Sequence, residues 1–417
     1  MRRKQTAVKL FLIVFLLQSS LFAQTDSLKA LLSAYKFIKT ENNVISNPAC
    51  LDTFFETLYQ LKTNKSEIVP VVHIGDSHIQ ADYFSGMMRM SLQRAFGNAG
   101  RGLIFPYKVA KTNEPYNYKT SSNAEWGACR IVFPNPIFPI GVCGITMRTS
   151  NPKADIRLKT FNYPGLDYSF RHIDIYQEND TASFGIGICD TLGNVLQNAV
   201  VSQNPQYKFL STINLPVSIN EVILNNLCTD TVKQKYSQIY GLVLRNDSNG
   251  LIYHTIGING AMYQNYSSSR HFCNQLQTLK PRLIIISLGT NEAQSLRLTK
   301  EQFYLQIDSL VNQLKANTKA NFLLTLPQDS YRRKCHYNPQ VKMIAETLIE
   351  YAKKNKIAYW DYYTIAGGYK SCYSWKKKGL IRQDGLHLNR AGYEIQGKLL
   401  YTALLNAYNR YVSDRHP

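Results

Sequence analysis

The stretch Ile68-Val-Pro-Val-Val-His-Ile-Gly-Asp-Ser77 decides the fold of this 417-residue chain. Its first seven residues form a short apolar run, in which Pro70 is tolerable only near the start of a strand. The run is therefore predicted to be the first strand of a sheet, and Gly75, Asp76 and Ser77 follow its carboxyl end. Open α/β sheets build their reactive sites outside the carboxyl ends of parallel strands.

Alternating strands and helices follow in the second half of the chain. Leu283–Leu288 is a nearly continuous apolar run, typical of a strand that is covered on both faces. Thr299 and Gln302 form a capping-box pattern that opens a helix. We expect further strands at 251–258, 322–326 and 358–361, and helices at 269–279, 299–316, 339–355 and 391–411. This alternation predicts an α/β fold with a parallel sheet.

The middle of the chain has a different pattern. Residues 154–159 and 170–176 alternate apolar and polar side chains, and clusters of Asn, Asp, Gly and Pro separate further β-rich runs at 184–188, 207–213, 221–224 and 239–244. Several short strands with regular turn signals indicate a β-sandwich. We therefore expect an inserted β-sandwich over 108–249. It would divide the α/β domain into a first part at 24–107, which begins with a helical approach, and a second part at 250–417.

The N-terminus reads as a signal peptide over 1–23. Basic residues at 2–4 precede the apolar run Leu10–Leu17, and small residues lead to a cleavage point after Ala23. The apolar run is shorter than the roughly 20 residues that a spanning helix needs. We expect a mature chain without a transmembrane anchor, exported to the periplasm or beyond.

Charge and cysteine content limit the partners. The net charge is +20, and loss of the four basic leader residues leaves +16. This balance favours polyanionic partners or is simply a solvated basic surface, and export argues against nucleic acid. Eight cysteines permit disulfides in an exported chain, but the sequence cannot choose their pairing. There is no Cys-x-x-Cys motif and no histidine pair at helical spacing, so no zinc site is expected.

Three polar stretches hold the parts of a serine nucleophile site: Gly75–His78, Gly289–Glu292 and Asp384–His387. A serine hydroxyl needs a base that takes its proton as it attacks. Ser77 is the predicted nucleophile, His387 its base, and Asp384 the carboxylate that orients the base. Gly385 permits the turn that would bring Asp384 back to His387.

The tetrahedral intermediate of such a reaction needs donors aimed at its oxyanion. The backbone N–H groups of Ser77 and Gly260 and the side-chain amide of Asn291 are the candidates, because each follows a predicted strand. Together these residues predict hydrolysis or transfer of an ester.

Other polar residues beside these stretches have structural interpretations. Asp76 is expected to form the turn, His78 to be structural or substrate-facing, and Glu292 to hold the loop after Asn291. Gly97-x-x-Gly-x-Gly102 follows a helical stretch and lacks a suitably placed lysine, so it is not read as a phosphate loop. Lys376–Lys378 precedes Asp384 closely, and we expect either a solvated run or contact with an acidic polymer.

The order Gly-Asp-Ser, Gly, Gly-x-Asn and Asp-x-x-His resembles that of the SGNH (GDSL-type) hydrolases. On their pattern Ser77, Gly260, Asn291 and His387 are the four name-giving residues. The stretches 75–84, 96–102 and 253–261 look like exported peptidoglycan O-acetylesterases, which carry a carbohydrate-binding-like β-sandwich between the serine and glycine blocks. This resemblance implies a flavodoxin-like three-layer α/β/α domain and cleavage of acetyl esters on cell-wall glycan, without metal or organic cofactor.

Two alternatives to an esterase stay open at this point. A transferase would pass the same acetyl group from Ser77 to a glycan hydroxyl, and the triad alone does not distinguish it. A glycan-binding protein on a degenerate hydrolase scaffold is the alternative from another class. The sequence names no sugar-binding residue among its 28 tyrosines, nor the acetylated position, protein partners or oligomeric state.

Overall fold

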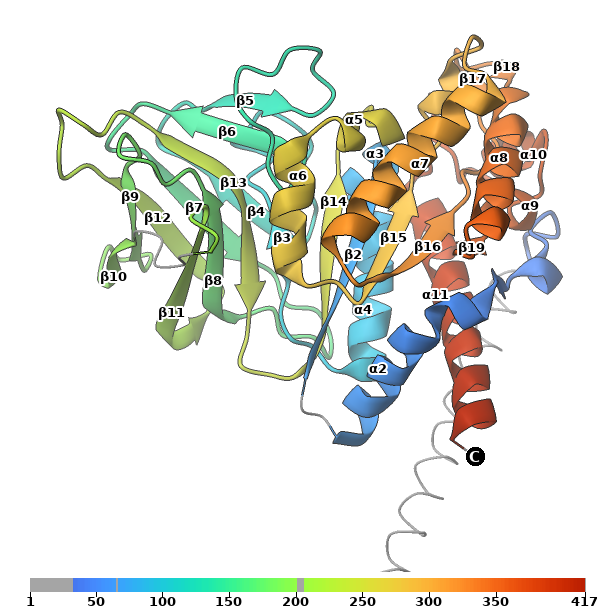
Figure 1. Cartoon of the computed structure of the whole chain (residues 1–417), viewed down its shortest axis with the longest axis horizontal. Helices are drawn as coiled ribbons and strands as arrows, with labels where there is room; N and C mark the ends of the chain where they lie inside the picture. The colour runs from blue at the N-terminus through green and yellow to red at the C-terminus, as the bar shows by residue number, and fades with distance from the viewer. Residues whose placement is uncertain (1–32, 65–66, 201–205, 417) are drawn as a thin grey trace, which may run out of the picture.

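The computed structural model describes residues 33–64, 67–200 and 206–416. The predicted signal peptide lies outside these described residues. Figure 1 shows an α/β unit on one side of the molecule and a β-sandwich on the other.

A six-stranded sheet forms the centre of the α/β unit. Its strands lie in the order β1-β19-β16-β15-β2-β14, and all are parallel except the edge strand β1. The chain passes from β2 to β14 on one side and then to β15 on the other, so the strand order reverses beside β2. Ligands of open α/β sheets bind at such a switch point. The bounds are β1 Ile45–Ser46, β2 Ile68–Gly75, β14 Gly250–Gly257, β15 Leu283–Ser287, β16 Asn321–Thr325 and β19 Ala358–Trp360.

Helices cover both faces of this sheet and make three layers. Successive side chains of β2 point to opposite faces: Val69 and Val71 pack in one core cluster, and Val72 and Ile74 in the other. Helices α2, α4 and α11 pack on the first face, and α6, α7 and α8 on the second, as Figure 1 shows. The bounds are α2 Asp52–Asn64, α4 Tyr83–Phe96, α6 Arg270–Leu276, α7 Lys300–Asn317, α8 Gln340–Lys354 and α11 Arg390–Arg415.

The predicted strands of the second half are present within one residue. The predicted helices are also present, but α11 extends four residues beyond the predicted end at 411, and the helix expected over 269–279 is α6 followed by the 3-10 helix Gln277–Leu279. The capping box is also confirmed, because Thr299 and Gln302 each accept a hydrogen bond from the other's backbone N–H, at 3.2 and 3.1 Å. Four short helices complete the fold: α3 Ser77–Gln80, α5 Tyr263–Ser267, α9 Tyr362–Ile365 and α10 Ser371–Lys377. A small hairpin, β17 Tyr331–Arg332 and β18 His336–Tyr337, was not expected from the sequence.

Two antiparallel sheets form the β-sandwich. One has the order β10-β9-β12-β7-β4, and the other β11-β8-β13-β6-β5 with β3 also paired to β13. Their bounds are β3 Gly102–Ile104, β4 Tyr118–Ser121, β5 Gly127–Arg130, β6 Ile145–Thr149, β7 Asp155–Thr160, β8 Phe170–Gln177, β9 Gly185–Cys189, β10 Val195–Val200, β11 Leu210–Ile219, β12 Glu221–Leu227 and β13 Ser237–Arg245. The α/β fold with a β-sandwich within it is therefore confirmed.

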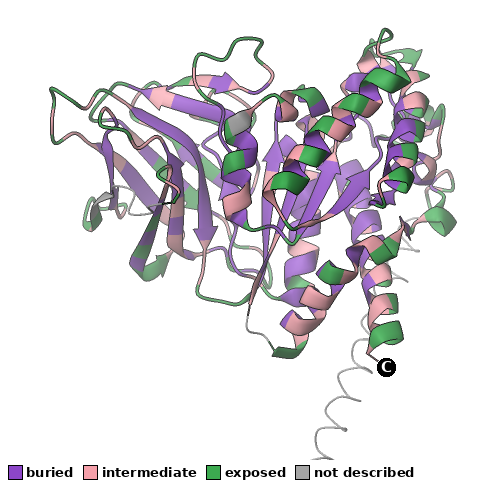
Figure 2. Cartoon of the chain, viewed as in Figure 1, coloured by how far each residue is buried: buried purple, intermediate pink, exposed green. Residues whose placement is uncertain are grey.

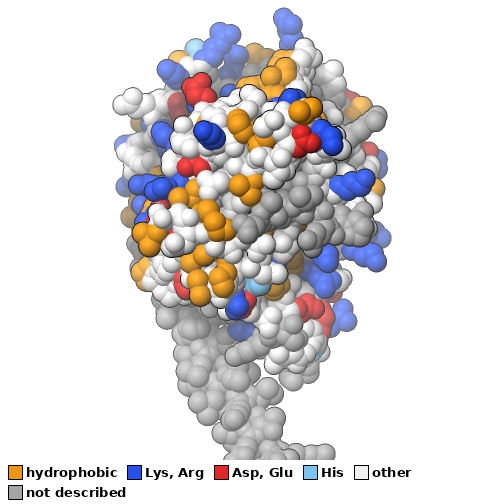
Figure 3. Space-filling model, turned by 90° about the vertical axis from the view of Figure 1, so that its left-hand side faces the viewer, with side chains coloured by type: hydrophobic (Ala, Val, Ile, Leu, Met, Phe, Trp, Pro, Cys, Tyr) orange, Lys and Arg blue, Asp and Glu red, His pale blue; other side chains and the backbone are white. Residues whose placement is uncertain are grey.

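The β-sandwich and the α/β unit share one continuous core. A single cluster of buried side chains contains Ile156 and Leu242 of the sandwich together with Val72 and Ile74 of the central sheet. Figure 2 shows the same buried colour on the strands of both parts. Figure 3 shows the end of the molecule that the sandwich forms, where hydrophobic side chains lie scattered between polar ones and basic side chains are frequent at the edges.

Two further observations concern the whole chain. All eight cysteines are free thiols, and Cys273 is buried while Cys189 is half-buried. Of the helices in the described ranges, none has the length and apolar character that crossing a membrane requires.

Candidate active site

Ser77 is the first residue of α3, directly beyond the carboxyl end of β2. Asp76 caps this short helix by accepting the N–H of His78 at 2.9 Å, which is the turn-forming role expected for it. The turn is tight at Gly75, because a Cβ there would lie 2.2 Å from Ile79 Cγ1 and 2.8 Å from the carbonyl oxygen of Ser287. The sequence therefore needs glycine at 75 to place the Ser77 hydroxyl at the edge of the sheet.

The structure brings Ser77, His387 and Asp384 together, although 307 positions separate the serine from the aspartate. The Oγ of Ser77 lies 2.8 Å from Nε2 of His387, and Nδ1 of the same ring lies 2.8 Å from Oδ2 of Asp384. Because the carboxylate can only accept, Nδ1 carries the proton. Nε2 is then free to accept the hydroxyl proton of Ser77.

Backbone donors fix the carboxylate of Asp384. Its Oδ1 accepts the N–H groups of Leu386 and His387 at 2.8 and 2.9 Å. Partial burial alone would raise the pKa of Asp384, but these two N–H groups and the His387 ring outweigh it and hold the pKa below its ordinary value. Asp384 is thus kept ionised and aligned toward the ring.

The turn that carries Asp384 and His387 is closed by its own backbone and by the β17–β18 hairpin. Gly385 has φ +71°, and its carbonyl oxygen accepts the N–H of Tyr331 at 2.9 Å. The N–H of Arg382 donates to the His387 carbonyl oxygen at 2.8 Å. These bonds hold the turn at both ends.

The predicted oxyanion donors come from three neighbouring segments. Gly257 pairs with Gly75 in the parallel register of β14 and β2, so Gly260 follows on the same side of the sheet as Ser77. Gly260 has φ +83° and open space around its Cα. Gln80 joins this loop to α3, because its Oε1 accepts the N–H of Asn259 at 2.7 Å. Sequence reasoning did not single out Gln80.

Asn291 reaches the same place, but its amide is engaged. Its Nδ2 donates to Oδ2 of Asp76 at 3.1 Å and to the carbonyl oxygen of Ala261 at 3.0 Å. Both N–H bonds of the amide are therefore used within the protein. A role at the oxyanion requires that Asn291 releases or shares one of these two bonds.

The ring of His78 lies beside that of His387 and makes its hydrogen bond to a different partner. Its ring centroid is 5.1 Å from that of His387, and its Nδ1 lies 2.9 Å from the hydroxyl of Tyr393 on α11. Burial, followed by the neighbouring His387, lowers the pKa of His78 to about 3, so the ring is neutral. It supports the ring of His387 from one side, and Tyr393 is a contact that the sequence did not indicate.

Two carboxylic acids close to Ser77 and Asn291, Asp76 and Glu292, are buried. Oε1 of Glu292 accepts the N–H of Tyr263 at 2.8 Å, which holds the loop after Asn291 as expected. Burial raises the pKa of Glu292 to about 7, and burial together with Glu292 raises that of Asp76 to about 8. These carboxyl groups hold protons more tightly in the folded state than in the unfolded chain.

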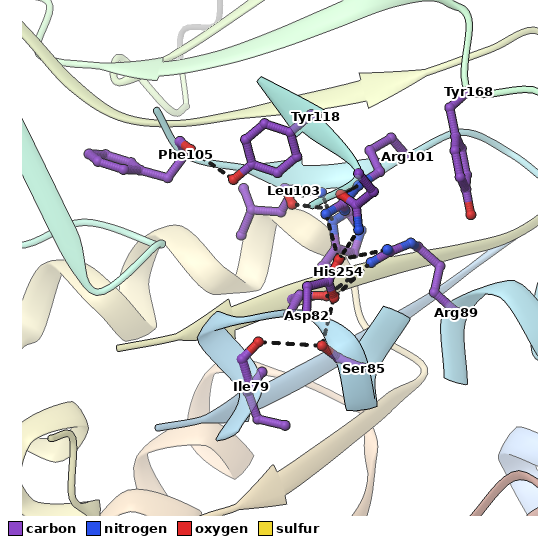
Figure 4. Close-up of polar contacts among 12 residues, drawn as sticks. Ile79, Asp82, Ser85, Arg89, Arg101, Leu103, Phe105, Tyr118, Tyr168 and His254 are labelled. Carbon is purple, nitrogen blue, oxygen red and sulfur yellow. Dashed lines mark hydrogen bonds and ion pairs between the residues drawn. The ribbon is translucent and has the colours of Figure 1, made fainter. Parts of the chain in front are cut away.

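A buried charge cluster follows α3 and joins it to the sandwich. Figure 4 shows the guanidinium groups of Arg89 and Arg101 converging on the carboxylate of Asp82, at 2.7 and 3.0 Å. Asn117 and Ser85 also donate to this carboxylate. Burial disfavours the charge, but the two arginines keep the pKa of Asp82 below its ordinary value. The segment just beyond α3 is thus held by the ion pairs of Asp82.

The site is open to solvent. The side chains of His387 and Asp384 are 27% and 39% exposed. A pocket of about 260 Å³ lies elsewhere, between the segment 43–55 and the C-terminal part of α11. An open site of this kind admits a group that is carried on a large molecule.

Residues 228–395 match the model of the GDSL-like lipase/acylhydrolase family. The chain thus contains a GDSL-like acylhydrolase domain, as the motifs predicted, and the matched segment includes Gly260, Asn291, Asp384 and His387. No curated protein sequence matches the chain.

One solved structure shares this fold along nearly its whole length. A structure described as a peptidoglycan O-acetylesterase in action superposes with a TM-score of 0.71 at 19% identity, over 86% of this chain and 96% of that one. A lipase/acylhydrolase from Enterococcus faecalis gives a TM-score of 0.31 at 19% identity, over 39% and 77% of the two chains. An acetylxylan esterase mutant from Geobacillus stearothermophilus gives 0.30 at 15% identity, over 37% and 73%.

Proposed function

We propose that this protein is an exported serine esterase that removes O-acetyl groups from a cell-envelope polysaccharide, with peptidoglycan as the first choice. The observation that carries the proposal is the hydrogen-bonded series from Ser77 through His387 to Asp384, at 2.8 Å for each step. Such a series activates a hydroxyl for attack on an ester carbonyl.

The reaction proceeds in two halves. Ser77 Oγ attacks the acetyl carbonyl carbon while Nε2 of His387 takes the hydroxyl proton. The N–H groups of Ser77 and Gly260 and the amide of Asn291 stabilise the negative charge on the carbonyl oxygen. The intermediate then expels the sugar oxygen, which receives the proton from His387. Water, deprotonated by His387, attacks the acetyl-serine and releases acetate.

The choice of an acetylated glycan rests on three supports of different kinds. The fold is shared along almost the whole length of a peptidoglycan O-acetylesterase. The predicted leader over 1–23 supports export to the compartment that holds such a polymer. We further propose that 108–249 is an inserted domain of carbohydrate-binding type and that the mature charge of +16 favours an acidic glycan.

A transfer assay tests the proposal against its nearest alternative. The purified protein is given a small acetyl ester, with and without a non-acetylated glycan as acceptor. An esterase releases acetate at the same rate in both cases and leaves the glycan without acetyl groups. Acetyl groups that appear on the glycan at the expense of acetate would identify a transferase and contradict the proposal.

A further inference from the structure

Five residues form a surface beside the turn that carries Asp384 and His387; four of them are exposed and Tyr331 is buried beneath them. We call Tyr331, Tyr337, Tyr369, Lys370 and Lys376 the basic tyrosine patch; they come from β17, β18, α10 and the loop before α10. In Figure 1 these elements lie on the side of the molecule away from the β-sandwich.

The three rings of the patch lie in series. The ring centroids of Tyr331 and Tyr337 are 5.5 Å apart with an interplanar angle of 31°, and those of Tyr337 and Tyr369 are 6.2 Å apart at 58°. Tyr337 is 37% exposed and Tyr369 is 48% exposed. The two exposed rings, backed by the buried ring of Tyr331, offer flat apolar surface to a ligand, with a separation close to the length of one pyranose unit.

Ammonium groups stand over the same rings. Nζ of Lys370 lies 5.2 Å from the centroid of Tyr337 and 5.5 Å from that of Tyr369, and Nζ of Lys376 lies 5.3 Å from that of Tyr331. These contacts restrain the lysines while leaving their charge available to an anion.

The surroundings of the patch carry more cations than carboxylates; Asp384 on the neighbouring turn is 39% exposed, and Asp329 beside Tyr331 is buried. The segments 330–345 and 365–383, which contribute it, contain no aspartate or glutamate. They contribute further exposed cations at Arg333, Lys334, Lys377, Lys378 and Arg382. A surface with this excess of cations attracts negatively charged ligands.

The patch begins at the catalytic turn itself. The backbone N–H of Tyr331 donates to the Gly385 carbonyl oxygen, and a Cβ at Gly385 would lie 2.8 Å from Cδ2 of Tyr331. A ligand on the patch is therefore held directly beside the segment that carries the proposed base.

We propose that the basic tyrosine patch binds the strand of a carboxylate-bearing polysaccharide whose acetyl group reaches Ser77. The tyrosine rings stack on the C–H faces of the sugars, and Lys370 and Lys376 meet the carboxylates. The proposal rests on the proposed function, which supplies the acetylated glycan, and it adds where the glycan lies and why an acidic one is preferred.

The first test removes the two charges. We compare kcat/KM for soluble O-acetylated peptidoglycan fragments with kcat/KM for a small acetyl ester, in wild type and in Lys370→Gln/Lys376→Gln. We expect the ratio of the two values to fall roughly tenfold. The control is Lys353→Gln/Lys354→Gln. It removes two lysines at the C-terminal end of α8, close to the start of β19. One of them, Lys354, lies 5.4 Å from the ring of Tyr304.

The second test separates stacking from charge. Tyr337→Ala/Tyr369→Ala is expected to lower the same ratio several-fold, whereas Tyr337→Phe/Tyr369→Phe restores it, because phenylalanine keeps the flat face. A ratio that stays at the wild-type value in both the lysine and the alanine variants would overturn the patch and leave the esterase intact. Wild-type protein that releases no acetate from either substrate would overturn the proposed function and, with it, the occupant assigned to the patch.

Discussion

Asn291 can act in two ways, as an oxyanion donor or as the residue that fastens the Gly260 loop. Its two N–H groups donate to Asp76 and Ala261 in the structure. A transition-state role and a loop-fastening role give different consequences on substitution, because only the first acts on the developing oxyanion.

We expect Asn291→Ala to lower kcat for a small acetyl ester by roughly 10²–10³-fold, the usual cost of one lost oxyanion donor. KM should change little, because the ground-state carbonyl gains less from the donor than the oxyanion does. Steady-state kinetics and a thermal unfolding curve measure both quantities. A variant with near-normal kcat and a lowered Tm would assign Asn291 to fastening the Gly260 loop instead.

Glu292 makes stability depend on pH. Its ordinary pKa is 4.5 and its folded pKa is about 7, so between these values the folded state holds a proton that the unfolded chain has lost. The contribution of Glu292 to the free energy of unfolding is therefore fully present below pH 4.5. It is lost as the pH rises toward 7, by on the order of 3 kcal/mol from this group alone.

Glu292→Gln removes this dependence, because glutamine can still accept the N–H of Tyr263 and does not ionise. We expect its free energy of unfolding, relative to wild type, to rise between pH 4.5 and pH 8. Urea unfolding of both proteins at the two pH values measures the difference. A constant difference across this range would contradict the buried, protonated state assigned to Glu292.

At the level of elements, Gly385 allows the turn that carries Asp384 and His387 to pack against the β17–β18 hairpin. Its φ of +71° favours glycine, and a Cβ there would also lie 2.8 Å from Tyr331 Cδ2 and 3.2 Å from the carbonyl oxygen of Lys334. Gly379 has nearly the same φ, +67°, but a Cβ there would meet nothing within 4 Å. Substitution of these two glycines therefore distinguishes the cost of backbone strain, which both share, from the displacement of the hairpin, which only Gly385 would cause.

Gly379→Ala is expected to cost about 1 kcal/mol of stability, from the left-handed backbone alone, and to keep its activity. Gly385→Ala carries the same strain and also pushes the hairpin from the turn, so kcat should fall at least roughly tenfold. Kinetics and Tm of both variants provide the comparison. Equal activities in the two variants would mean that the hairpin does not hold the turn.

The elements were predictable where the sequence pattern is long or chemically specific. The run Leu283–Leu288 and the capping box at Thr299 each determine one element by local physics. The β17–β18 hairpin was missed, because two-residue strands show no periodicity and its turn places Arg333 and Lys334, not glycine, at positive φ. The contacts of Asn291 and of His78 with Tyr393 depend on tertiary packing, which a motif does not encode.

At the scale of the whole molecule, the buried charge cluster around Asp82 joins the two parts of the fold. Asp82 and Arg89 belong to the α/β unit, and Arg101 and Asn117 lead into the sandwich. With the continuous core, this predicts one cooperative unfolding transition instead of two. The sequence did not indicate the cluster, because its members become neighbours only after folding.

We expect Asp82→Asn to lower stability by about 3–5 kcal/mol, because it leaves two buried guanidinium groups without a countercharge. The unfolding should remain a single transition in scanning calorimetry. Lys159→Gln is the control; it breaks an ion pair with Glu221 whose lysine side chain is 51% exposed, and it should cost less than about 1 kcal/mol. Two separate transitions, or equal losses in the two variants, would show that the parts unfold independently of the cluster.

Acetate release from O-acetylated peptidoglycan by wild type and by Ser77→Ala tests the central claim most directly. Ser77 is the only side chain in the proposed mechanism that bonds to the acetyl carbon, so its loss removes the acetyl-enzyme. We expect steady release by wild type and none above background by Ser77→Ala of the same fold. Equal release by both proteins would contradict it.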